Sequence, residues 1–307
     1  MKRYNPPPLL TAVAVLWTAI ACVEDLNWET NYEKKPVINC VLCPNEVQTL
    51  RLSYNNQTGS DIFRDFENIE HAKATLWCDG NEVGTFTDIR FGRYTLNHRP
   101  KTGATYRLEV RLEDGRVLWA ETTFPKPVRV RLNTANRGDE FRRHLIQENV
   151  REPYWIFHLN RSEDILAFPA TVTPDDHLVM EIGTDHPDRD DFNTTGPVMF
   201  SHSTGGGFGT TKEHLAYLRI APKPDRENAS FCLEGLLSSL RALIIIRSVS
   251  PEYDAYLKST LEKMHAHFSF EDPTSWLEEV DTYSNIEGGL GIFGAWADRV
   301  LYISPIP

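Results

Sequence analysis

Apolar and polar residues alternate in short runs through the first third of the chain. In the run Thr105–Leu112 every second side chain is apolar, which is the period of a strand with one buried face. Turn signals such as Asp79-Gly80-Asn81 and Asp114-Gly115 separate the runs, because hairpin turns need backbone angles that Asn, Asp and Gly tolerate. The pattern predicts seven strands: Val37–Cys43, Val47–Tyr54, Ala72–Cys78, Glu82–Phe86, Phe91–Leu96, Ala104–Leu112 and Arg116–Thr123.

Seven short strands within about ninety residues are typical of an immunoglobulin-like β-sandwich. We therefore predict such a domain over residues 36–125, with the stiff sequence Pro125-Lys126-Pro127 at its boundary. The expected fold class is mainly β.

Residues 126–307 are predicted to form a second β-rich domain that carries one α-helix. The helix is expected at about residues 250–268, because Ser250 suits the N-cap, Pro251 suits the first helical position, and apolar residues then recur at helical spacing. Further strands are predicted, the last of them after a glycine-rich loop: Val128–Leu132, Tyr154–Leu159, His177–Ile182, Leu215–Ile220, Leu240–Val249 and Arg299–Ser304.

The N-terminus has the features of a secretory signal. Lys2 and Arg3 precede a mostly apolar run, Leu9–Ala21, which is shorter than the ~20 residues of a membrane-spanning helix. The sequence Ala19-Ile20-Ala21-Cys22 resembles a bacterial lipobox, in which small residues precede a cysteine. We predict a signal peptide over residues 1–21 and lipid attachment at Cys22. Ordinary secretory cleavage, which would leave a free cysteine, is the alternative.

Residues 22–35 are polar and lack periodicity, so we expect a lipidated tether. The net charge of the chain is −11, and the signal peptide contributes only positive charges. An acidic protein repels phosphate backbones, which argues against nucleic acid as a partner. We expect no cofactor.

Four cysteines follow Cys22: Cys40, Cys43, Cys78 and Cys232. An exported protein meets oxidising conditions, so a disulfide between Cys40 and Cys78 on two predicted strands is an open possibility. Cys40 and Cys43 have CxxC spacing, but no second Cys or His pair accompanies them as a zinc site requires. The acidic run Asp185–Asp191 is expected to be a solvated loop rather than a calcium site. No metal site is predicted.

Two longer motifs lie in the second half, SVSPEYDAYL at Ser248–Leu257 and YSNIEGGLGIFG at Tyr283–Gly294. They resemble the "SxEYxxYL" and "YSNIxxGLGxFG" motifs of the DUF4249 family of Bacteroidota outer-membrane lipoproteins. Gly92-Arg93-Tyr94 and Gly103–Leu108 also fall where that family has its "GxY" and "GxxYxL" elements. The resemblance implies a lipoprotein of undefined biochemical role that is often encoded beside a TonB-dependent transporter. In that phylum acidic residues after the lipidated cysteine favour export to the cell surface, and Glu24-Asp25 fit this pattern.

The segment Tyr283–Gly294 has two interpretations. Its glycines allow backbone conformations closed to other residues, so it could be a crossing loop that plugs the base of the second domain. Alternatively, it could be a docking surface for a transporter. The candidate residues for either role are Tyr283, Asn285, Gly288, Gly289, Gly291 and Phe293.

The sequence has no Gly-x-Ser-x-Gly elbow and no HExxH motif, so we predict no catalytic residues. The leading hypothesis is an accessory binding subunit for a TonB-dependent transporter, lipid-anchored in the outer membrane and exposed at the cell surface. The second hypothesis is a structural or adhesive surface lipoprotein, and the third is a hydrolase.

Overall fold

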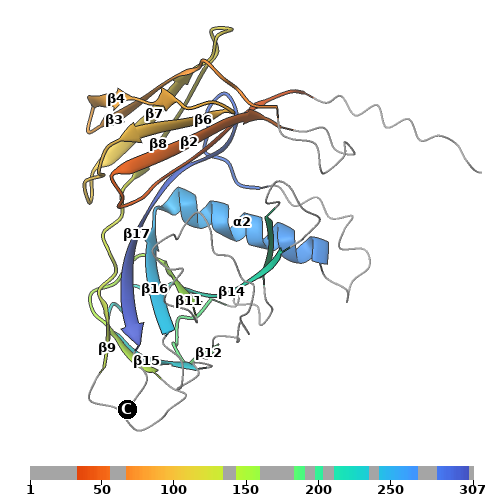
Figure 1. The fold of residues 1–307 in the computed structure, drawn as a ribbon. Coiled ribbons are helices and arrows are strands. Elements are labelled where there is room, and N and C mark those ends of the chain that lie inside the picture. Colours follow the sequence, from red (N-terminus) through yellow and green to blue (C-terminus); the bar gives the residue numbers. More distant parts are fainter. Residues whose placement is uncertain are drawn as a thin grey trace, which may run out of the picture.

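The computed structural model describes residues 33–55, 67–133, 143–159, 183–190, 198–202, 211–234, 242–268 and 282–303. Within these ranges the chain is mainly β, and its strands form three sheets beside the helix α2, Pro251–Phe268 (Figure 1). None of the helical residues described forms a span long and apolar enough to cross a membrane.

Two sheets pack face to face to form the first β-sandwich. Alternation produces its core: Tyr106, Leu108 and Val110 of one strand are fully buried, whereas the residues between them are not. Each of the seven strands predicted in this region is present within two residues of its predicted bounds. One sheet contains β1 (Pro36–Leu42), β2 (Val47–Tyr54), β6 (Arg93–Asn97) and β5 (Thr87–Asp88), and the other contains β4 (Asn81–Thr85), β3 (Lys73–Cys78), β7 (Thr105–Arg111) and β8 (Val117–Thr123).

A single long strand, β17 (Leu290–Ile303), links the two halves of the molecule (Figure 1). Its first part pairs in parallel with β1, from Val37 opposite Leu290 onward. Its second part pairs antiparallel with β16 (Ala242–Val249), beginning with Val249 opposite Trp296. The resulting nine-stranded sheet therefore runs through both sandwiches.

This strand corrects two predictions. The glycine-rich loop expected before Arg299–Ser304 is instead a strand that starts at Leu290. The second domain, expected over 126–307, does not contain all of these residues, because Ile286, Phe293 and Ala295 pack in the core of the first sandwich. The glycines of this segment indicated a loop in the sequence. In the structure they permit close approach to neighbouring segments of the same chain.

The second β-sandwich uses the other strands of the long sheet and a separate four-stranded sheet. Its core joins the two layers: Val130, Leu145 and Phe231 pack with Ile156 and Ile244. The strands are β13 (Val198–His202), β14 (Thr211–Ile220), β11 (Tyr154–Leu159) and β16 in one layer, and β12 (Gly183–Thr184), β15 (Ala229–Glu234), β10 (Arg143–Gln147) and β9 (Val130–Leu132) in the other. The predicted segment His177–Ile182 lies outside the described residues, and β10, β12, β13 and β15 were not predicted.

Helix α2 confirms the predicted start and covers the opposite face of the long sheet. The Ser250 hydroxyl accepts the Tyr253 N–H (3.4 Å), as an N-cap does. Tyr253 and Leu257 pack in a third cluster with Trp155, Phe157 and Trp296 of the sheet.

A buried polar contact adds to that apolar interface. The Asp254 carboxylate accepts hydrogen bonds from the Trp155 indole (2.9 Å) and from the Arg219 guanidinium at 2.9 and 2.6 Å. The guanidinium–carboxylate contact is bidentate, which fixes orientation as well as position. The first turn of α2 is therefore held in one place on the sheet.

Candidate functional site

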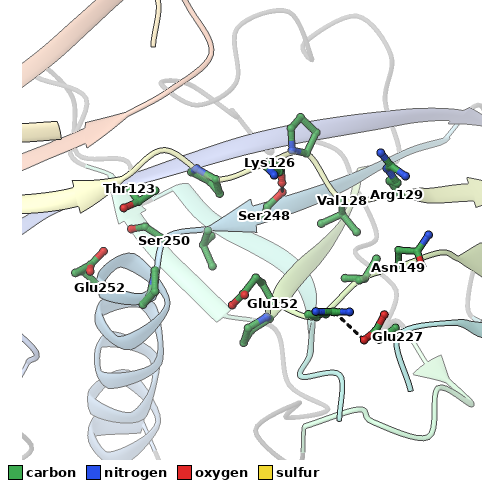
Figure 2. Close-up of a pocket in the computed structure, with 17 residues that line it drawn as sticks. Thr123, Lys126, Val128, Arg129, Asn149, Glu152, Glu227, Ser248, Ser250 and Glu252 are labelled. Carbon is green, nitrogen blue, oxygen red and sulfur yellow. Dashed lines mark hydrogen bonds and ion pairs between the residues drawn. The ribbon is translucent and has the colours of Figure 1, made fainter. Parts of the chain in front are cut away.

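A groove with a volume of about 810 Å³ lies where the two sandwiches and the first turn of α2 meet (Figure 2). This volume is in the range of small-ligand sites, and such sites are common between domains. Its walls come from the linker after β8, the turn before β11, the end of β16 and the start of α2. The lining residues are Thr123, Pro125–Arg129, Asn149–Pro153, Glu227 and Ser248–Glu252.

Two side-chain contacts hold the walls of the groove together. The Ser248 hydroxyl donates to the Lys126 carbonyl oxygen (2.6 Å), so the linker is tied to β16. The Thr122 hydroxyl donates to the Glu252 carboxylate (2.9 Å), which ties the first sandwich to α2. Since β17 also runs through both sandwiches, the groove is preformed.

The groove presents charges of both signs. Arg151 and Glu227 form an ion pair across part of it (2.7 Å; Figure 2). Lys126, Arg129 and Glu152 are exposed, and no hydrogen bond or ion pair engages their side chains within the described part of the chain. A ligand that carries both positive and negative groups would find a partner for each of them here.

A buried polar network supports the wall that carries Glu227. The Gln147 amide donates to the Arg226 and Glu227 carbonyl oxygens (3.2 and 3.3 Å), and its own oxygen accepts the Tyr154 hydroxyl (2.7 Å). His186 Nε2 lies 3.2 Å from the same Gln147 oxygen. The network therefore links the inside of the second sandwich to the groove.

His186 occupies this network in one protonation state. Its Nδ1 accepts the Asp188 N–H (3.0 Å), so the proton belongs on Nε2, which donates to Gln147. Burial lowers the pKa of His186 and outweighs the opposite effect of the nearby Asp188 and Asp185 carboxylates.

The surroundings of His186 correct the prediction of a solvated acidic loop. His186 and Asp188 are both buried, and the Asp188 carboxylate pairs with Arg226 (2.7 Å). The run of acids gave no sign of this, because the cation that makes burial of Asp188 tolerable lies in a distant segment.

The segment Tyr283–Gly294 packs against the first sandwich and not against the base of the second. Glu287 exchanges backbone hydrogen bonds with Trp119 of β8 (3.2 and 2.9 Å), and the Tyr283 N–H donates to Ser259 on α2 (2.8 Å). Of the proposed docking residues, Phe293 is fully buried, and the nearest groups to Gly288 and Gly289 belong to β8 and β1. Tyr283 and Leu290 are its exposed large apolar side chains.

The cysteines behave differently from the prediction. Cys40 and Cys78 are both buried in the first core as free thiols, one in each sheet of the sandwich, so the possible disulfide between them is not formed. Burial raises the pKa of the Cys40 thiol, which keeps it protonated and unreactive. Cys22 lies outside the described residues.

A thiol–imidazole contact was not expected from the sequence. Cys232 Sγ lies 3.0 Å from His144 Nδ1, on neighbouring strands β15 and β10. Neither residue lines the groove. No group of three or more His, Cys, Asp or Glu residues in the described ranges could hold a metal ion.

Comparison with known proteins identifies the family. The model of a domain of unknown function, DUF4249, matches residues 23–300, which is most of the chain. The chain belongs to the DUF4249 family. No curated protein matches this DUF4249 sequence. A crystal structure from Corynebacterium diphtheriae, described as a proposed membrane-anchored protein, is 8% identical with a TM-score of 0.22. That match covers 70% of this chain and 55% of the other.

Proposed function

We propose that this DUF4249 protein is a cell-envelope lipoprotein, anchored through Cys22, that acts as an accessory binding subunit for a TonB-dependent transporter. The groove between the two sandwiches is its ligand site. The observation that supports this most directly is the preformed groove of about 810 Å³ with exposed groups of both charges.

The lipobox-like sequence and the polar residues that follow it favour the anchor, and Glu24-Asp25 favour the cell surface as its location. A rigid groove on a tethered protein suits capture and delivery, because a preorganised site loses little entropy when a ligand binds. A structural or adhesive lipoprotein would need no such groove.

The partner is tested by affinity purification. The tagged, lipidated protein is isolated from detergent-solubilised outer membrane, and the co-purifying proteins are identified by mass spectrometry. We expect a TonB-dependent barrel in an amount comparable to the bait. Absence of such a barrel contradicts the transporter role.

The groove is tested by filling it. Thr123 is exposed and lines the groove, so Thr123→Trp adds bulk there without touching either core. Native mass spectrometry of protein from its own host should detect a small ligand on the wild type and none on this variant. Thr85→Trp, at an exposed position on β4, is the matched control and should keep the ligand. A ligand retained equally by both variants places binding elsewhere.

A further inference from the structure

The hairpin between β5 and β6 presents two large apolar side chains to solvent. Ile89 is 50% exposed and Phe91 is 66% exposed, the highest fractions for large apolar residues in the described ranges. Exposed apolar side chains are common singly, but here two lie on one four-residue turn. Residues 89–92 are called the apolar tip.

The backbone of the apolar tip is in an unusual conformation. Arg90, Phe91 and Gly92 all have positive φ angles, of 80°, 55° and 65°. A residue as bulky as Phe rarely adopts this region. Strain of this kind persists only where the surrounding structure fixes it, and it gathers at functional positions.

Acidic side chains hold the backbone of the apolar tip through hydrogen bonds. The Asp88 carboxylate accepts the His71 N–H (3.0 Å) and the Arg90 N–H (2.7 Å), and these two bonds lower the pKa of Asp88. The Glu70 carboxylate accepts the Phe91 N–H (3.0 Å).

The adjacent strand fixes the tip as well. The Gly92 carbonyl accepts the Leu52 N–H (2.7 Å), and a Cβ at Gly92 would collide with the Leu52 carbonyl oxygen. The hairpin is therefore built to hold Ile89 and Phe91 outward.

The apolar tip lies at the end of the first sandwich where the N-terminal tether enters. Strand β1 begins at Pro36, which pairs with Tyr54 at the end of β2. Strand β6 begins beside the tip at Arg93, which pairs with Arg51 near the same end of β2. The lipidated residue Cys22 is thus joined by a short segment to the end of the molecule that carries the tip.

The charges near the tip suit an anionic membrane surface. Arg90 and Arg93 are exposed, and neither forms an ion pair within the described residues. Of the nearby acids, Glu67 pairs with Lys34 (2.6 Å), while the Glu70 and Asp88 carboxylates keep their charge and accept backbone hydrogen bonds. The Arg90 and Arg93 guanidinium groups are therefore not taken up by these acids and can meet lipid headgroups.

We propose that the apolar tip inserts Ile89 and Phe91 into the membrane surface, with Arg90 and Arg93 against the headgroups. An anchor at Cys22 attaches the chain to the membrane at one point, which does not by itself fix an orientation. Insertion of the tip fixes one orientation, in which the first sandwich meets the bilayer and β17 leads away from it to the second sandwich. The orientation rests on the proposed anchor at Cys22, but the affinity of the tip for lipid does not.

The test uses the mature chain, residues 22–307 with Cys22→Ala, so that neither the signal peptide nor a lipid anchor contributes to binding. Sedimentation with vesicles of equimolar phosphatidylethanolamine and phosphatidylglycerol measures partitioning. We expect binding to weaken by about a hundredfold for Ile89→Ser with Phe91→Ser, because burial of each side chain is worth about a factor of ten or more. Reversal of charge by Arg90→Glu with Arg93→Glu should weaken binding and remove its dependence on phosphatidylglycerol.

Val47→Ser with Val300→Ser is the matched control, since both valines are exposed and distant from the tip in the strand pairings. It should bind vesicles as the parent does. Equal vesicle binding by the parent and the Ile89/Phe91 variant overturns the proposal. The proposal is also overturned if the Ile89/Phe91 variant still binds vesicles but no longer co-purifies with a membrane protein. The tip would then be a contact with that protein. If Cys22 of the wild type is not labelled by a fatty acid but vesicle binding is intact, the proposed anchor is wrong and the proposed insertion of the apolar tip stands.

Discussion

The Asn285 side chain makes both hydrogen bonds of the Phe293 backbone. Its Nδ2 donates to the Phe293 carbonyl oxygen (2.8 Å), and its Oδ1 accepts the Phe293 N–H (2.9 Å). Asn285 thus acts as a strand neighbour for β17 opposite β1, and it fixes the segment that precedes β17 against the first sandwich. This explains in physical terms why an asparagine stands eight residues before a buried phenylalanine in this motif.

Asn285→Ala should destabilise the protein by about 2–4 kcal/mol, because it leaves two backbone groups of a buried residue without partners. The free energy of unfolding from urea titration measures the effect, with an unchanged slope as evidence of an intact native state. Asn97→Ala, at an exposed position of β6, should change it by less than about 0.5 kcal/mol. A loss no larger than that of the control would show that Asn285 does not support β17.

Gly291 should be even less tolerant of substitution. It has φ of +107°, and a Cβ there would overlap the Ile38 carbonyl oxygen of the paired strand β1. Gly291→Ala should therefore cost more than about 4 kcal/mol or prevent folding.

Gly115 is the matched control for Gly291, because it has φ of +88° with open space where a Cβ would lie. Gly115→Ala should cost only the conformational strain, about 1–2 kcal/mol. Thermal unfolding of the two purified variants compares them directly. Similar small losses for both would mean that β1 and β17 can separate without penalty.

Local signals account for the parts of the fold that the sequence predicted. Alternation in Tyr106, Leu108 and Val110 and the cap at Ser250 act within a few residues, so the strands of the first sandwich and the start of α2 were predictable. The first part of β17, before the predicted strand at Arg299, was not, because its glycines and alanines are explained only by the neighbours they approach. Phe293 lies beside residues of β1 that are about 250 positions away in the chain.

The groove was only half predictable. The stiff linker Pro125-Lys126-Pro127 and the helix start at Ser250 were both identified from sequence, and both line it. What brings them together is the Ser248 bond to Lys126 and the shared strand β17, and pairings over such distances leave no local pattern. The buried network of Gln147 and His186 was missed for the same reason.

The His186 network predicts loss of stability in mild acid. Its folded-state pKa lies below the ordinary value of 6.5, so the unfolded chain takes up the proton first as the pH falls. Stability contributed by neutral His186 is therefore complete well above pH 6.5 and is lost as the pH falls through about 6.5 toward the lowered pKa.

His186→Asn tests this effect, since an amide oxygen can still accept the Asp188 N–H but does not titrate. Melting temperatures measured from about pH 8 to about pH 5 should fall less steeply for the variant than for the wild type. Identical slopes for the two proteins would exclude His186 as the titrating group.

Cys22→Ala should abolish incorporation of a labelled fatty acid and weaken attachment to the membrane. The anchor is expected to dominate, because each buried methylene of a lipid chain contributes about 0.8 kcal/mol and two or more chains hold stably. Val23→Ala, which leaves the cysteine in place, should be labelled normally. The apolar tip could retain some unlipidated protein at the surface, so release is best measured in the triple variant that also carries Ile89→Ser and Phe91→Ser. Labelling of Cys22→Ala, or full membrane retention of the triple variant, would contradict a lipid anchor at this cysteine.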